Sequence, residues 1–336
     1  MNFKRFITTI DGHTEGEIFR VVTSGMPNIR GKTMVEKRDF VSQNLNHLCS
    51  ALCDEPRGHK SMFVAILTPP VSNNADVGVL FTQPPECYPD MCGHALIGIA
   101  TLAAEMGIIE PKEPVTEVVF DVPAGTIHAR VNVERGKAKS ATIQNVPSFL
   151  YKTTLIKVPS LGELPVDIAF GGNFFGIVEA RDIGIEPKPD DIIQAQARGL
   201  FKEIMDSINQ QVEVQHPQSP LIKGILEVLI SDKPRNPKAN TINIAISGDG
   251  GMDRSPCGSG TSAKIASLWT KGELNLEETY VTESIIGSLF YAKLIREVRV
   301  GNFKAVVPEI TGRAFIIGSH TFVIDEDDPF KYGFRL

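Results

Sequence analysis

Two short stretches of this 336-residue chain each place a cysteine directly before a glycine and the start of a helix-like run. They read "DMCGHALIGIATLAAEMG" at residues 90–107 and "DRSPCGSGTSAK" at residues 253–264. A cysteine at a helix N-terminus lies beside unpaired backbone N–H groups and the positive end of the helix dipole, which lowers the thiol pKa from about 8.5 toward neutrality. Such a thiol can exchange a proton at working pH, and the same N–H groups can bind a carboxylate.

Two matched thiols, Cys92 and Cys257, suggest chemistry that neither could do alone. One thiolate can remove the α-proton from one face of an amino acid while the opposite thiol protonates the other face, which racemises the carbon without a cofactor or a metal. Asp253 is placed to hold a cationic amine, and His94 could hydrogen-bond the amine or the carboxylate. Structural roles stay open: Asp253 could cap its turn, His94 could be a buried structural histidine, and the thiols could be inert.

Other chemistries of a cysteine or a glycine-rich loop explain the pattern less well. A cysteine protease uses one cysteine with a histidine and an Asn or Asp, and does not account for a matched pair. A thiol–disulfide enzyme needs two cysteines close together as CxxC. The stretch "GDGGMDRSPCGSG" lacks the GxxxxGK[ST] spacing of a phosphate-binding loop.

Composition bounds the class of protein. The chain is 42% hydrophobic and 22% charged with a net charge of −6, which indicates a globular protein and argues against nucleic acid or an anionic membrane as partner. The N-terminal segment lacks the apolar core of a signal peptide, and no stretch is long and apolar enough to span a membrane, so we expect a cytoplasmic protein. Five cysteines are too few for a disulfide framework, and we expect Cys49 and Cys53 to be buried hydrophobes and no metal site.

The order of elements contains a weak internal repeat. Helices are predicted over 34–54, from Cys92 to Gly107, over 189–212 and after Cys257, with strands between them and a strand-rich tail from 279. A glycine follows each of the two cysteines at the same distance (Gly107 and Gly272), and "VTE" then begins at 115 and at 281. The pattern predicts a duplicated α/β domain, with residues 1–160 carrying Cys92, residues 161–336 carrying Cys257, and extreme C-terminal strands able to pack back on the first domain.

At these residues the sequence resembles the proline racemase family. "MCGH" at 91–94 and "DRSPCGSGTSA" at 253–263 are similar to its two catalytic blocks. "EPRGH" at 55–59, "GGNFF" at 171–175 and "VIDEDDPFKYGF" at 323–334 are similar to further parts of it. The resemblance covers essentially the whole chain.

The resemblance implies a fold and a site. The fold is two α/β domains related by a pseudo-twofold, as in diaminopimelate epimerase, with the active site between them and usually a homodimer as the assembly. Cys92 and Cys257 would be the two acid/base thiols, and His94 and Asp253 would hold the ring nitrogen. The carboxylate would be bound by the backbone N–H groups of Gly93, His94, Gly258 and Ser259. No cofactor is implied.

The family has three activities, and the resemblance separates them in part. Family dehydratases acting on trans-3-hydroxyproline typically carry threonine where Cys257 stands, so cysteine favours a racemase or an epimerase. Phe63 is typical of proline racemases, whereas Ser247 and Pro89 depart from the racemase pattern and hint at 4-hydroxyproline. We therefore predict interconversion of L- and D-proline, with 4-hydroxyproline 2-epimerase as the alternative. The dehydratase and a non-catalytic binding module of the same fold are less favoured.

Overall fold

The computed structural model describes residues 4–59, 61–83, 88–248 and 250–335. It divides the chain into two compact units, which are described separately. Unit 1 comprises Met1–Ala141 and Arg313–Leu336, and unit 2 comprises Thr142–Gly312. The division therefore falls after Ala141 and not after residue 160 as predicted, because the strand Phe149–Val158 pairs along its length with Gly162–Phe170 in unit 2.

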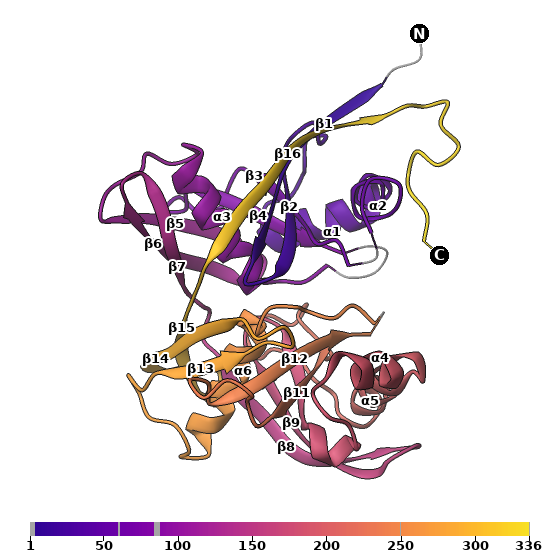
Figure 1. Cartoon of the computed structure of the whole chain (residues 1–336), viewed down its shortest axis with the longest axis vertical. Coiled ribbons are helices and arrows are strands. Elements are labelled where there is room, and N and C mark those ends of the chain that lie inside the picture. Colours follow the sequence, from indigo (N-terminus) through magenta and orange to yellow (C-terminus); the bar gives the residue numbers. More distant parts are fainter. Residues whose placement is uncertain (1–3, 60, 84–87, 249, 336) are drawn as a thin grey trace. The chain divides into compact units, whose positions relative to one another are not determined.

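Unit 1 is built on one sheet with the strand order β16-β1-β2-β3-β4-β5-β6-β7. Its strands are β1 (Arg5–Thr14), β2 (Glu17–Ser24), β3 (Val64–Thr68), β4 (Val77–Thr82), β5 (Val115–Val122), β6 (Gly125–Glu134), β7 (Lys137–Gln144) and β16 (Ala314–Ile324). The end of β7, from Thr142 onward, already belongs to unit 2. The β2–β3 and β4–β5 pairs are parallel, while β1 pairs antiparallel with both β2 and β16. The last strand of the chain thus lies beside the first, as Figure 1 shows for β16 in yellow and β1 in indigo.

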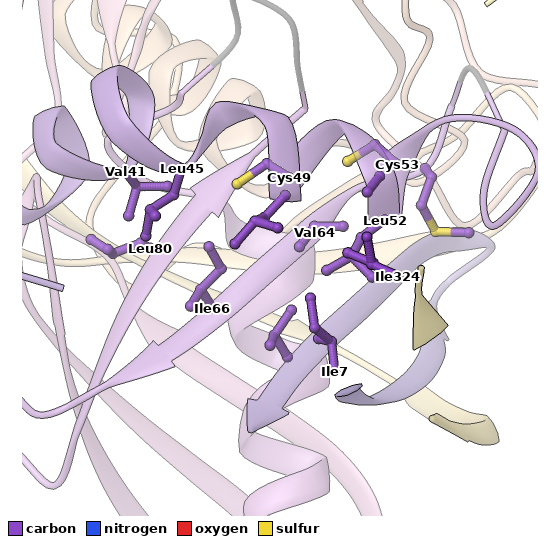
Figure 2. Close-up of a cluster of buried hydrophobic side chains, with 14 of the residues drawn as sticks. Ile7, Val41, Leu45, Cys49, Leu52, Cys53, Val64, Ile66, Leu80 and Ile324 are labelled. Carbon is purple, nitrogen blue, oxygen red and sulfur yellow. The ribbon is translucent and has the colours of Figure 1, made fainter. Parts of the chain in front are cut away.

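Three helical segments cover or fill unit 1. They are α1 (Met34–Phe40), a π-helical turn (Val41–Leu45) that continues into α2 (Asn46–Cys53), and α3 (Gly93–Glu105). The predicted helix over 34–54 is thereby confirmed, and its apolar face packs with β1, β3 and β16 in the cluster of Figure 2. Every residue of α3 from Gly93 to Ala104 is buried, as expected for a helix that is apolar on all sides.

Unit 2 has the strand order β8-β9-β10-β11-β12-β13-β14-β15. Its strands are β8 (Phe149–Val158), β9 (Gly162–Phe170), β10 (Phe174–Glu179), β11 (Glu227–Asp232), β12 (Thr241–Ser247), β13 (Tyr280–Glu283), β14 (Leu289–Val300) and β15 (Phe303–Gly312). Its helices are the 3-10 turn Ala180–Ile183, α4 (Pro189–Ala197), α5 (Leu200–Gln211) and α6 (Gly258–Thr270). The helix predicted over 189–212 is interrupted at Gly199, whose φ of 74° is left-handed.

The two units repeat one internal design. In each, a hairpin (β1–β2, β9–β10) leads through a helical segment to a strand that pairs parallel with the hairpin's second strand (β3, β11). The next strand is antiparallel (β4, β12) and is followed by a helix of 13 residues, α3 or α6. Beyond that helix comes a second parallel pairing (β4–β5, β12–β13). In unit 2 the strand β8 pairs with the first hairpin strand, β9. In unit 1 the equivalent position beside β1 is occupied by β16, so unit 1 needs the C-terminal strand to complete its sheet.

Candidate active site

In unit 1 the first cysteine block, residues 91–94, forms the N-terminus of helix α3. Cys92 is the residue before the first residue of α3, with extended backbone angles (φ −141°, ψ 109°), and it is 7% exposed. Its Sγ lies 3.2 Å from Nδ1 of His94, which is also buried. The first N–H groups of α3 have no carbonyl partner within the helix, so thiol, imidazole and backbone donors come together here.

Phe63 packs against this group. It immediately precedes β3, is buried, and meets the His94 ring edge-on with a centroid distance of 5.0 Å. The hydroxyl of Thr14, at the end of β1, donates to the backbone oxygen of His94 at 2.7 Å. The structure therefore brings Phe63, Cys92, Gly93 and His94 together, as the sequence analysis expected of one half of a site.

Sequence reasoning missed a buried ion pair next to the first cysteine. Asp90, two residues before Cys92, is buried and pairs with Arg38 of α1, which also binds Asp39 at 2.7 Å. Burial raises the pKa of Asp90 to about 6, although the guanidinium acts in the opposite direction. The two partners are far apart in the chain, so no local pattern in the sequence could have joined them.

In unit 2 the second block forms a helix N-terminus of a different kind. Cys257 precedes α6 with φ 60° and ψ 102°, a conformation that costs a residue with a side chain about 1–3 kcal/mol. Its Sγ accepts a hydrogen bond from the backbone N–H of Gly260 at 3.3 Å and lies 3.8 Å from Oγ of Ser259. Strain at such a position is typical of a functional residue.

Asp253 supports the turn that carries Cys257. Its carboxylate accepts from the N–H of Ser255 at 2.7 Å, and Oγ of Ser255 in turn accepts from the N–H of Cys257 at 3.2 Å. Capping, the structural role that the sequence left open for Asp253, is therefore present. It coexists with proximity to the thiol, so the structure brings Asp253, Cys257, Gly258 and Ser259 together in unit 2.

The lowered thiol pKa expected at a helix N-terminus is wrong for Cys257. Burial raises the pKa of this thiol well above its usual value, and the charges of Asp253 and Glu227 raise it further. The hydrogen bonds from Gly260 and Ser259 act in the opposite direction but do not outweigh them. The physical reason is that the side chain is 4% exposed, so a thiolate loses most of its hydration.

In each unit, the first strand of the hairpin or the turn after it contacts a backbone oxygen in the first turn of the 13-residue helix. The "GGNFF" block forms the turn between β9 and β10, and a β-carbon on Gly171 would collide with the backbone oxygen of Ser259. In unit 1 the end of β1 meets the oxygen of His94 through Thr14. Asn145, which sequence reasoning missed, donates to the oxygen of Gly171 and to Oγ of Ser262, both at 2.8 Å.

Within unit 1, the segment around "EPRGH" (55–59) is bonded to the C-terminal tail. The N–H of Phe334 donates to the oxygen of Glu55 at 2.9 Å, and Arg335 pairs with Asp54. Arg57 binds the carboxylate of Asp328 at 3.3 Å. The "EPRGH" block and the C-terminal tail thus hold each other, and their role in the structure is packing.

Cys49 and Cys53 are buried, as expected. Cys49 and Cys53 are free, fully buried thiols in the apolar cluster of Figure 2, and burial raises the pKa of Cys49 to about 12. Cys87 lies outside the described residues. Within the described part of the chain, no group of three or more His, Cys, Asp or Glu side chains is arranged to hold a metal, and no helix is both long and apolar enough to cross a membrane.

Comparison with known proteins decides the family. A family model described as proline racemase matches residues 9–335, nearly the whole chain. This chain belongs to the proline racemase family. It is 45% identical to the proline racemase of Clostridioides difficile and 43% identical to a 4-hydroxyproline 2-epimerase of Streptosporangium roseum, in each case over the full length of both chains.

The fold comparison agrees. The structure is similar to that of a hydroxyproline epimerase from Agrobacterium vitis with bound trans-4-hydroxy-L-proline, with a TM-score of 0.93 and 33% sequence identity over 100% of this chain and 96% of that one. The α/β fold implied by the resemblance is confirmed. As a member of the proline racemase family, the chain is an isomerase that racemises or epimerises an amino acid.

Proposed function

We propose that this member of the proline racemase family interconverts L- and D-proline with Cys92 and Cys257 as its two acid/base groups. The observation that carries the proposal is the repeated placement of a buried cysteine directly before a 13-residue helix in two units of the same internal design. A duplicated fold that keeps one proton-transfer group in each copy suits a reaction that treats the two faces of one carbon alike.

The proposed reaction moves one proton on and one proton off the α-carbon. The substrate carboxylate binds the N–H groups of Gly93, His94, Gly258 and Ser259, and the ring nitrogen pairs with Asp253 and His94. One thiolate takes the Cα proton, its S–H bond forms as the C–H bond breaks, and the resulting carbanion takes the proton of the other thiol on the opposite face. No electrons leave the substrate, so the reaction needs no oxidant and no cofactor.

Substrate binding would itself adjust Cys257. The negative charge of Asp253 raises the pKa of this thiol in the free protein. A cationic ring nitrogen paired with Asp253 cancels much of that charge, so the thiolate becomes easier to form when substrate is present. The raised pKa of the free protein favours the protonated thiol when no substrate is bound.

Two observations favour proline over 4-hydroxyproline. Phe63 presents a buried apolar ring beside His94, and a substrate hydroxyl left without a partner costs about 1–3 kcal/mol. Oγ of Ser247, which the sequence offered as a partner for such a hydroxyl, donates to the oxygen of Gly251 at 3.1 Å within its own turn. One relative at 43% identity is a 4-hydroxyproline 2-epimerase, which keeps this activity as the second candidate.

The experiment is a comparison of the two substrates. L-Proline and trans-4-hydroxy-L-proline are incubated separately with the enzyme, and chiral chromatography measures the rate at which each α-carbon inverts. We expect kcat/KM for proline to exceed that for hydroxyproline by roughly tenfold to a hundredfold. Turnover of hydroxyproline alone would replace the proposal by the epimerase. We also propose a homodimer, which light scattering after gel filtration tests directly.

A further inference from the structure

The two catalytic cysteines are held differently by their helices. Cys92 has an extended backbone and its Sγ lies beside the imidazole of His94. Cys257 has a φ of 60°, and its Sγ lies over the first turn of α6 where the N–H of Gly260 donates to it at 3.3 Å. The left-handed φ of Cys257 therefore places its sulfur where the N–H of Gly260 can donate to it, whereas Cys92 has extended backbone angles.

Gly260 is the feature that makes this position available to the sulfur. A β-carbon added at Gly260 would lie 3.0 Å from Sγ and 3.4 Å from Cβ of Cys257, and 2.9 Å from Cδ1 of Leu229. Sulfur and carbon at 3.0 Å are well inside van der Waals contact, so the thiol would have to move. The third residue of α3 is Ala95, which already has a β-carbon.

We propose that Gly260 is a positioning residue for Cys257: the absence of a side chain at the third residue of α6 lets the sulfur rest on the helix N-terminus and receive a backbone hydrogen bond. The proposal rests on the proposed function, in which Cys257 must alternate between thiol and thiolate. It assigns to the glycine a role in proton transfer without contact with the substrate.

The electrostatics of the site explain why one hydrogen bond matters. Burial and the charges of Asp253 and Glu227 all disfavour a thiolate at Cys257, whereas the hydrogen bond from the N–H of Gly260 favours it. If the sulfur moves off this N–H, the thiolate loses both the hydrogen bond and the positive end of the helix dipole. Proton transfer at this position then becomes slower at every pH below the thiol pKa.

The test is the variant Gly260→Ala with a readout for each thiol. Iodoacetamide alkylates thiolates, so peptide mass spectrometry as a function of pH gives a separate midpoint for Cys257 and for Cys92 in the same molecule. We expect the Cys257 midpoint to rise by about one pH unit, which slows its alkylation about tenfold at lower pH, while the Cys92 midpoint stays in place. Racemisation should fall in kcat more than it changes KM.

Two controls separate this effect from general damage. Ala95→Gly changes the corresponding residue of α3, and it should leave the Cys257 midpoint where it is in the wild type. Alanine is the better helix former, so α6 itself is not weakened by Gly260→Ala. If the contact with Leu229 prevents folding, the double variant Gly260→Ala/Leu229→Ala removes that contact and must still show the raised midpoint.

The outcomes are distinguishable. A Cys257 midpoint and a racemisation rate equal to those of the wild type in a folded Gly260→Ala or double variant would overturn the proposal. Racemisation that survives Cys257→Ser would instead refute the proposed function, because the thiol would then not be an acid or base at all. Loss of activity in Cys257→Ser together with unchanged behaviour of Gly260→Ala leaves the function standing and removes the role of Gly260.

Discussion

The residues at equivalent places beside the two thiols are chemically different. His94 and Ser259 are both the second residue of their helix, and both lie near the sulfur of the preceding cysteine. Asp253 adds a negative charge on the side of Cys257. In the reaction that we propose, the two enantiomers of proline are equally stable in water, so kcat/KM must be the same in both directions. The differences between the half-sites can therefore appear only in the separate kcat and KM values for L- and D-proline.

Replacing either thiol tests the two-base mechanism at the residue scale. Serine has a hydroxyl that does not ionise near neutral pH, so Cys92→Ser and Cys257→Ser should each lower racemisation by at least about a hundredfold. Each variant keeps a base on one face, and it should still exchange the α-proton of one enantiomer with deuterium from solvent. Mass spectrometry of recovered L- and D-proline measures this exchange. A single variant that racemises at the wild-type rate would exclude the two thiols as the acid and base.

Substrate choice can be shifted at Phe63. Phe63→Thr puts a hydroxyl on this wall, which can pair with a substrate hydroxyl, so we expect the preference for proline over 4-hydroxyproline to narrow. Phe63→Leu is the matched control, because it also shortens the side chain but stays apolar. The measurement is kcat/KM for proline divided by kcat/KM for 4-hydroxyproline in each variant. If this ratio changes equally in both variants, the size of the side chain and not its polarity sets the selectivity.

At the scale of elements, an aromatic cluster in unit 2 encloses a histidine. His216 follows α5 and packs on Phe149 of β8 and Phe170 of β9, with ring centroids 5.7 Å and 4.7 Å away. Its Nδ1 accepts from the N–H of Gln218 at 3.3 Å, which requires an unprotonated nitrogen. Burial lowers the pKa of His216, so the fold favours the neutral ring over the charged one.

The stability of unit 2 should therefore decrease in acid. The pKa of His216 is lower in the folded state than in the unfolded chain, where it is about 6.5. The contribution of neutral His216 to the free energy of unfolding is fully present above that value. It is lost as the pH falls below it, because the unfolded chain takes up the proton before the folded protein does. Urea unfolding followed by the fluorescence of the single tryptophan, Trp269 of α6, should show a lower midpoint near pH 5 than near pH 7.5. His216→Phe should reduce this difference.

At the scale of the whole molecule, the two units differ in how the chain builds them. Unit 2 is one continuous segment, Thr142–Gly312. Unit 1 is completed by residues from the far end of the chain, since β16 pairs with β1 from Arg5↔Ile324 to Thr14↔Ala314, and Ile324 joins the core cluster with Ile7. Stability of unit 1 thus depends on the last part of the sequence.

Truncation after Gly312 should destabilise unit 1 and leave unit 2 folded. Removing β16 leaves β1 as an unpaired edge and opens the cluster around Ile7, so unit 1 should lose its fold while unit 2 keeps it. Hydrogen exchange should then show protected amides in α6 and unprotected amides in α3, and Trp269 should keep its native fluorescence. Equal protection of both helices would show that unit 1 is stable without its C-terminal strand.

The sequence by itself predicted the two-thiol chemistry that we propose and a duplicated α/β domain. Two Cys-Gly steps with matching glycines after them predicted a helix after each cysteine, and the structure has α3 and α6 there. Such features are local: a helix and its N-terminus are specified by neighbouring residues. For the same reason the buried roles of Cys49 and Cys53 could be predicted from their helical spacing.

Only the tertiary structure decided the properties that depend on distant parts of the chain. The division after Ala141 follows from the pairing of β8 with β9, and the pairing of Arg38 with Asp90 joins residues from separate elements. The pKa of Cys257 is raised because the fold buries the thiol beside Asp253 and Glu227, an effect that outweighs the helix N-terminus visible in the sequence. Local pattern specifies which groups can act, whereas desolvation and charge depend on everything that packs around them.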